Sequence, residues 1–202
     1  SLLGKDASGK AQTGTGKTAA FLITVITRLV SHPAQGKRKS GTPRILVLAP
    51  TRELVIQISE EARQLSKYCG LKIVSVFGGM DYDKQRRQLH GKPVDIIVAT
   101  PGRLLDFKRR KDLNLSRVEM LILDEADRML SMGFYPDMRE MQKYLPRKPI
   151  QGYMFSATYP PRVRSLAQQF LSDPGFLSLS SDNLLVAETE HRYTIVPEMD
   201  RD

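Results

Sequence analysis

The chain has 202 residues, of which 41% are hydrophobic and 26% are charged, a composition typical of one globular domain with a full core. The 31 Lys and Arg residues exceed the 22 Asp and Glu residues, and the net charge of +9 is compatible with a partner that carries phosphate groups. A single cysteine, Cys69, excludes a disulfide framework, and no apolar run reaches membrane-spanning length. We therefore expect a cytoplasmic protein, or a nuclear one if the source is eukaryotic, that does not contact a membrane.

The first informative segment is AQTGTGKT, residues 11–18, which we expect to bind a nucleotide polyphosphate. Gly14 and Gly16 allow successive backbone N–H groups to point at phosphate oxygens, and a helix that starts near Lys17 adds the positive end of its dipole. Lys17 would reach the β- and γ-phosphates, and the Thr18 hydroxyl would ligate Mg²⁺. The residues that would hold the nucleotide are Ala11, Gln12, Thr13, Gly14, Thr15, Gly16, Lys17 and Thr18.

Two features of this segment depart from the usual pattern. The pattern normally opens with glycine, where this chain has Ala11, and residues 6–10 have the composition of a poor strand. Taken alone, the segment could be only a Gly/Thr-rich turn before a helix.

Downstream of this loop, strands and helices alternate. Residues 44–49, 71–77, 94–99, 118–123 and 151–155 are typical of strands, and residues 51–68, 161–171 and a stretch from Pro101 are typical of helices. This alternation predicts an α/β fold, a doubly wound and mostly parallel sheet with helices on both faces. The Lys- and Arg-rich segment at residues 32–41 is expected to be a solvated loop, with contact to nucleic acid as the alternative.

Two adjacent carboxylates, Asp124 and Glu125, directly follow the strand expected at residues 118–123. Open α/β sheets bind their ligands at the carboxyl ends of strands. Asp124 would hold Mg²⁺, usually through water, and Glu125 would orient and deprotonate an attacking water. Two acidic residues in a turn, taken alone, would not indicate a catalytic site. Combined with Lys17, however, the two carboxylates predict the catalytic centre of a nucleoside-triphosphate hydrolase.

Further short segments follow the other strands: PTREL at residues 50–54, GG at 78–79 and TPGR at 100–103. In a parallel sheet all of them emerge at the same edge as Asp124. Thr51 and Thr100 could act only as helix caps, and the two glycines could form only a turn. Alternatively, these amides, hydroxyls and arginines line a track for a phosphate backbone.

Six segments, AQTGTGKT, PTREL, GG, TPGR, DEAD and SAT (residues 156–158), occur in the order and approximate spacing of the DEAD-box RNA helicases. Over nearly its whole length the chain resembles the first of that family's two RecA-like domains. The resemblance implies a RecA-like P-loop NTPase domain over residues 1–180, with ATP and Mg²⁺ between residues 11–18 and the Asp124–Glu125 pair.

The resemblance also implies single-stranded RNA, bound by its backbone with little sequence specificity. The RNA-binding residues would be Pro50, Thr51, Arg52, Gly78, Gly79, Thr100, Gly102 and Arg103. Ser156 and Thr158, with Asp127 as a hydrogen-bond partner, match the motif that couples hydrolysis to the unwinding of short duplexes.

Parts of the family pattern are expected to lie outside this chain. Family members carry an upstream glutamine that reads adenine, and a second RecA-like domain with arginine fingers. We expect residues 181–202 to be a linker in which residues 192–196 resemble the opening strand of that second domain. We therefore expect a part of a longer, monomeric protein. By itself this part would bind nucleotide weakly and hydrolyse it poorly, because an arginine finger contributes on the order of 10³–10⁵ in rate.

The sequence is also compatible with two alternative functions. A different P-loop enzyme, such as a nucleotide kinase or a DNA helicase, would share Lys17 and Asp124, and stimulation of ATP hydrolysis by RNA or by DNA would separate the two. A non-catalytic module that only clamps RNA would not need an intact Lys17, Asp124 and Glu125.

Overall fold

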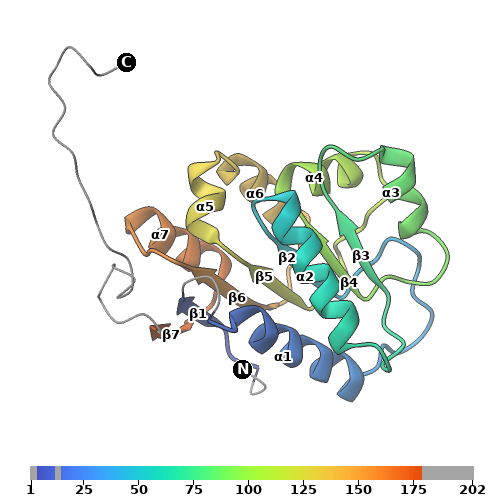
Figure 1. Ribbon diagram of the computed structural model, residues 1–202, viewed down its shortest axis with the longest axis horizontal. Helices are drawn as coiled ribbons and strands as arrows, with labels where there is room; N and C mark the ends of the chain where they lie inside the picture. Colours follow the sequence, from blue (N-terminus) through green and yellow to red (C-terminus); the bar gives the residue numbers. More distant parts are fainter. Residues whose placement is uncertain (1–3, 12–14, 179–202) are drawn as a thin grey trace, which may run out of the picture.

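A computed structural model of the protein describes residues 4–11 and 15–178 (Figure 1). The described residues form one sheet of seven strands in the order β3-β4-β2-β5-β6-β1-β7, and every neighbouring pair is parallel. The predicted α/β fold with a parallel sheet is therefore confirmed. The strands are β1 (Ala7–Lys10), β2 (Ile45–Leu48), β3 (Ile73–Val76), β4 (Ile96–Ala99), β5 (Met120–Leu123), β6 (Gln151–Ser156) and β7 (Gly175–Ser178).

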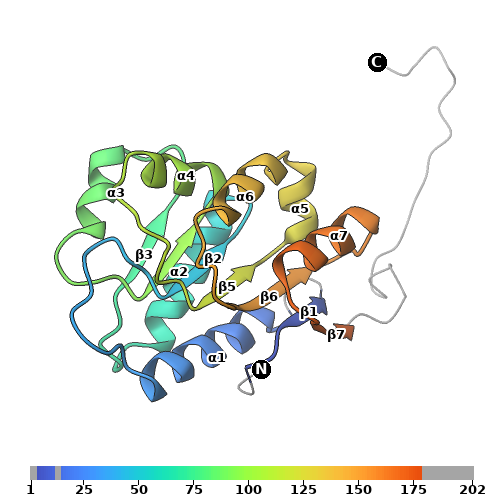
Figure 2. The same cartoon turned by 180° about the vertical axis from the view of Figure 1, so that it is seen from behind.

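Helices cover both faces of this sheet, as the doubly wound prediction requires. Two of them, α1 and α2, pack on one face, and the remaining helices cover the other, as the two opposite views show (Figures 1 and 2). The helices are α1 (Lys17–Ser31), α2 (Arg52–Leu65), α3 (Tyr82–Leu89), α4 (Pro101–Arg109), α5 (Ala126–Ser131), α6 (Tyr135–Gln142) and α7 (Pro161–Phe170).

Strands β2, β4 and β5 are apolar at every position because both faces of the sheet are buried there. In β2, Ile45 and Val47 join the core beneath α1 and α2, whereas Leu46 and Leu48 join the core on the opposite face. All four side chains are fully buried. A strand covered on both faces is a continuous apolar run rather than an alternating one, which is why the sequence signal for these strands was strong.

The expectation that residues 6–10 form a poor strand was wrong, because β1 lies between β6 and β7 and pairs with both. The buried carboxylate of Asp6 accepts hydrogen bonds from the backbone N–H of Gly152 (2.8 Å) and of Ser172 (2.6 Å). Gly9 also suits the close packing of β1, since a Cβ atom there would approach the Phe155 ring to 3.0 Å. Tertiary contacts thus override the weak strand propensity of ASGK.

Several short elements were not predicted, namely α3, α5, α6 and β7. None of the four exceeds eight residues, so none contains enough turns or alternations for a clear hydrophobic period. Gln12, Thr13 and Gly14, and the predicted linker at residues 181–202, lie outside the described residues. Within the two described ranges, no helix is both long enough and apolar enough to traverse a bilayer.

Candidate functional site

The segments singled out in the sequence meet at the carboxyl edge of the sheet. Backbone hydrogen bonds continue the ladder one residue beyond the strands, from Ala11 N–H to the Ser156 carbonyl (3.0 Å) and from Asp124 N–H to the Leu48 carbonyl (2.9 Å). Because all seven strands are parallel, the residues after β1 to β6 all lie on this edge.

The strand order divides this edge into two halves. Strands β3, β4 and β2 carry the Gly78–Gly79 pair, residues 100–103 and residues 50–52, the set predicted to contact RNA. Strands β5, β6 and β1 carry Asp124, Ser156 and Ala11, which belong to the predicted nucleotide and coupling sets. The two sets are therefore adjacent rather than mixed. The border between the predicted RNA half (β3, β4 and β2) and the predicted nucleotide half (β5, β6 and β1) runs between β2 and β5.

Lys17 and Asp124 form a buried ion pair at the nucleotide half. Gly16, in the left-handed conformation at φ 76°, ends the loop, and Lys17 is the first residue of α1. Its Nζ atom lies 2.9 Å from Asp124 Oδ1, with 6% and 0% of the two side chains exposed. Burial raises the pKa of Asp124 above its ordinary value, although Lys17 opposes this effect.

The second carboxylate oxygen of Asp124, Oδ2, is buried and has no hydrogen-bond partner. A buried acceptor without a partner is costly and needs an explanation. Among the described residues, no three His, Cys, Asp or Glu side chains gather into a metal-binding cluster. The donor set fits Mg²⁺, which is commonly held by one or two carboxylates together with water and substrate phosphates. Thr18, half-buried in the first turn of α1, offers a hydroxyl for the same ion.

Glu125 occupies a strained backbone position between β5 and α5. Its φ of 52° and ψ of 53° lie in the left-handed region, which costs a non-glycine residue about 1–3 kcal/mol. Its N–H donates to Asp124 Oδ1 (3.0 Å), and its Oε2 lies 3.3 Å from Arg128 Nη1. Such strain persists where the surrounding structure imposes it, and it is common at functional sites.

Asp127, Ser156 and Thr158 are connected by hydrogen bonds, as the sequence analysis expected. The Asp127 N–H donates to Ser156 Oγ (3.1 Å). The Thr158 N–H and hydroxyl both donate to Asp127 Oδ2, at 3.0 and 2.8 Å. Burial acts to raise the pKa of Asp127, but the hydrogen bonds from Thr158 and Ser156 outweigh it and hold the pKa below its ordinary value. This cluster ties the start of α5 to the end of β6.

The residues predicted to contact RNA have different local roles. Thr51 caps α2, since its hydroxyl accepts from the Leu54 N–H (3.3 Å). Thr100 precedes α4 but makes no capping hydrogen bond with its side chain. The guanidinium of Arg52 lies over the Phe77 ring, 5.3 Å from its centroid. Pro50 is buried, Gly102 is half-buried and Gly78 and Gly79 are exposed.

Arg103 and Gln85 position the segment that contains the two glycines. Arg103 Nη1 donates to the Met80 carbonyl (3.1 Å), and its side chain is only 16% exposed. Gln85 is fully buried, and its amide accepts from the Phe77 N–H (2.8 Å) and donates to the Phe77 carbonyl (3.0 Å). Gln85 was not predicted from the sequence. The available signal was a glutamine between Tyr82 and Leu89, on the buried stripe of a short helix.

Comparisons with known proteins agree with this geometry. The family profile described as DEAD/DEAH box helicase matches residues 1–166. The protein named ATP-dependent RNA helicase RhlB of Pseudomonas aeruginosa is 50% identical over 196 residues, which is 96% of this chain and 49% of that protein. The protein of the same name from Xanthomonas oryzae pv. oryzae is 45% identical over 95% of this chain and 33% of its own length.

A solved structure supports the same relationship. The crystal structure of a hypothetical ATP-dependent RNA helicase from Sulfolobus tokodaii superimposes with a TM-score of 0.76 at 35% identity, over 88% of this chain and 49% of that one. The chain thus spans about half the length of the Pseudomonas relative and about a third of the Xanthomonas relative.

Proposed function

Because the chain belongs to the DEAD/DEAH box helicase family, we propose that it is the ATP- and RNA-binding part of an ATP-dependent RNA helicase. With a second RecA-like domain of the longer protein, it would unwind short RNA duplexes or remodel RNA–protein complexes. The observation that carries this proposal is the divided carboxyl edge. A buried Lys17–Asp124 pair lies on one side of the border, and exposed glycines with nearby arginines lie on the other.

In the nucleotide half, Lys17 exchanges its ion pair with Asp124 for the β- and γ-phosphates of ATP, beside the N–H groups at the start of α1. Thr18 and Asp124 are the residues that would hold Mg²⁺, which when bound neutralises the charge that develops on the phosphates. Glu125 orients the attacking water and takes its proton. The raised pKa of Asp124 fits this exchange, because Lys17 does not fully offset the burial of the carboxylate, which would gain from a further cation.

In the RNA half, backbone amides at Gly78 and Gly79 and the side chains of Thr51 and Arg52 would face a phosphate backbone, which predicts a low sequence specificity. Arg103 acts mainly as a positioning residue, since it already donates to the Met80 carbonyl. The cluster of Asp127 and Thr158 carries the coupling. It joins α5, which follows Glu125, to the end of β6, so a displacement of either reaches the other.

The test is ATP hydrolysis by the longer protein with single-stranded RNA, duplex RNA or DNA of matched length. RNA should stimulate turnover, and DNA should not. Glu125→Gln should lower RNA-stimulated turnover by about 10²–10⁴-fold while RNA binding in the presence of ATP is retained. Glu60→Gln, on the exposed face of α2, is the matched control and should behave as the parent protein.

Two results would overturn the proposal. The enzyme assignment fails if Glu125→Gln leaves turnover unchanged. The RNA assignment fails if DNA stimulates hydrolysis as well as RNA does. We also expect the 202-residue chain alone to hydrolyse ATP slowly, because the proposed second domain would supply the arginines that complete the site.

A further inference from the structure

A hollow of about 460 Å³ lies at the amino edge of the sheet, opposite the candidate site. It is formed by the loop between α1 and β2 and the loop between α4 and β5. Five of its lining residues are Lys or Arg, one is acidic, and only Ala34 is apolar. The composition differs from that of the hydrophobic small-molecule pockets common in proteins.

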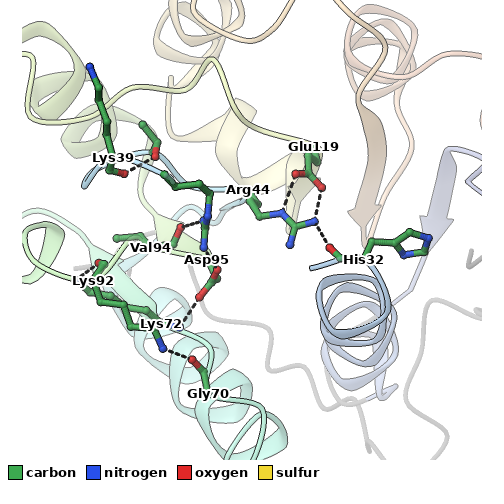
Figure 3. A network of polar contacts seen from close by, with 11 residues as sticks. His32, Lys39, Arg44, Gly70, Lys72, Lys92, Val94, Asp95 and Glu119 are labelled. Atoms are coloured by element: carbon green, nitrogen blue, oxygen red, sulfur yellow. Dashed lines mark hydrogen bonds and ion pairs between the residues drawn. The ribbon is translucent and has the colours of Figure 1, made fainter. Parts of the chain in front are cut away.

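Two of the five cations are used to build the hollow. Arg44 is buried and donates to both carboxylate oxygens of Glu119 (2.7 and 2.9 Å) and to the His32 carbonyl (2.6 Å) (Figure 3). Arg38 pairs with Asp95 and donates to the Val94 carbonyl (2.8 Å). These contacts neutralise the two arginines and fix the basic loop against the starts of β2, β4 and β5.

The other three cations have no such role. Lys37, Lys39 and Arg117 are exposed, and none of their side chains has a carboxylate partner among the residues that the structure describes. They surround the hollow together with the polar side chains of Gln35 and Ser116. Three uncompensated positive charges at one site repel each other, so the arrangement favours an anionic ligand.

The chemistry of the lining points to phosphate groups rather than to a protein surface. Protein interfaces bury an apolar centre, and this hollow has none. Contacts to a nucleic-acid backbone come mainly from Lys, Arg, Ser, Asn and Gln side chains, which are the kinds of residue found here. The loop, predicted from the sequence to be solvated with nucleic-acid contact as the alternative, is therefore fixed by two arginines and displays its remaining charges.

We propose that this amino-edge hollow binds phosphates of the RNA backbone at a second contact, remote from the RNA half of the carboxyl edge. The identity of the ligand as RNA rests on the proposed function. The strands that separate the two edges span about 13 Å over four residues, and a strand of RNA must pass around the domain to reach both. An RNA must therefore be longer than the carboxyl-edge site to occupy both contacts at once.

The test compares the 202-residue chain with the variant Lys37→Ala/Lys39→Ala/Arg117→Ala. Its matched control, Arg87→Ala/Lys143→Ala/Arg147→Ala, removes three exposed charges that do not line the hollow. Affinity is measured for a single-stranded RNA of about 10 nucleotides, the size of one binding site, and for one several times longer. Thermal unfolding verifies that all three proteins are folded.

We expect the hollow variant to lose affinity for the long RNA and to keep its affinity for the short one. Each lost phosphate contact removes about 0.7 from the slope of log affinity against log salt, so three contacts remove about 2. Between about 50 and 200 mM salt, the affinity of the parent chain for long RNA should then fall about 20-fold more than that of the variant. Photocrosslinked long RNA should label peptides from residues 34–44 or 114–117.

Any of three outcomes would overturn the proposal. The hollow variant loses as much affinity for short RNA as for long RNA, the control variant loses as much affinity for long RNA as the hollow variant does, or the slope of log affinity against log salt is unchanged. If inorganic phosphate shifts the NMR signals of Lys37, Lys39 and Arg117 while RNA crosslinks only elsewhere, the hollow takes small anions and the RNA assignment is wrong. A negative result in this binding test does not affect the RNA-stimulated ATP hydrolysis expected of the longer protein. Absence of that hydrolysis would likewise not affect the measured contact with long RNA, so the two proposals are tested separately.

Discussion

The ammonium group of Lys17 lies 2.9 Å from Asp124 Oδ1, and neither side chain has more than a few per cent of its surface in contact with solvent. The residue predicted to bind phosphate and the residue predicted to hold Mg²⁺ thus bind each other. Each neutralises the charge that the other would otherwise bury. The pair would therefore link the proposed nucleotide binding to the stability of the fold.

We predict that Lys17→Met destabilises the nucleotide-free chain by about 3 kcal/mol at neutral pH, because it leaves the buried Asp124 carboxylate uncompensated. The double variant Lys17→Met/Asp124→Asn should recover most of this loss, since no charge then stays buried. The deficit of the single variant should shrink as the pH falls, because the pKa of Asp124 is already raised in the folded state and a protonated Asp124 needs no partner.

Urea unfolding of the three proteins without nucleotide measures these differences. A single variant as stable as the parent chain would mean that the ion pair does not form in solution.

Asp127 should make the free energy of unfolding depend on pH in the acid range. Its pKa is lowered in the folded state, so its contribution is fully present above the ordinary value of 3.8 and is lost as the pH falls through the lower, folded value. Asp127→Asn should therefore be less stable than the parent chain at neutral pH, with the difference vanishing in strong acid. Thr158→Val, which removes only the hydroxyl donor, should show part of the same effect. Unfolding free energies between pH 7 and pH 2 test this, and a constant difference across that range would contradict it.

The left-handed backbone conformation of Glu125 is strained, and replacing the residue with glycine should relieve this strain. We predict that Glu125→Gly costs little or no stability, because glycine adopts a φ of 52° without penalty. Arg128→Gly is the matched control on α5, the helix that follows Glu125; it lies at an exposed position with ordinary helical geometry and should cost about 1 kcal/mol. Thermal unfolding compares the two variants. Equal losses would show that Glu125 is not strained.

Substitutions at Gly78 and Gly79 separate the effect of a glycine on fold stability from its effect on RNA binding. Gly79 has a φ of +77°, so Gly79→Ala should destabilise the chain by about 1 kcal/mol, whereas Gly78 has open space and no such conformation. Gly78→Ala should fold as stably as the parent chain. If RNA approaches the backbone here, both variants should bind single-stranded RNA more weakly. Unfolding and RNA titrations of the same samples provide the two readouts, and unchanged RNA affinity in both variants would remove these glycines from the RNA-binding set.

Much of the candidate site could be predicted because its residues follow strong local signals. Asp124 follows an apolar strand, and Lys17 begins a helix after a glycine-rich loop. Where the local signal was weak, the prediction failed. ASGK at β1 has low strand propensity and forms a strand only because β6 and β7 pair with it. Gln85 was missed since its function as a buried clamp on Phe77 depends on a contact between separate elements.

The sequence by itself determined the fold class, the segments that reach the carboxyl edge and the types of chemistry that they carry, because these follow from local periodicity and from residue type. Only the tertiary structure decided which segments are neighbours. In a parallel sheet the long crossovers permit many strand orders, and side-chain packing on both faces selects β3-β4-β2-β5-β6-β1-β7. That order brings Lys17 to Asp124 and separates the RNA half from the nucleotide half. It also gathers the basic residues of two distant loops at the opposite edge, an arrangement that no local pattern could specify.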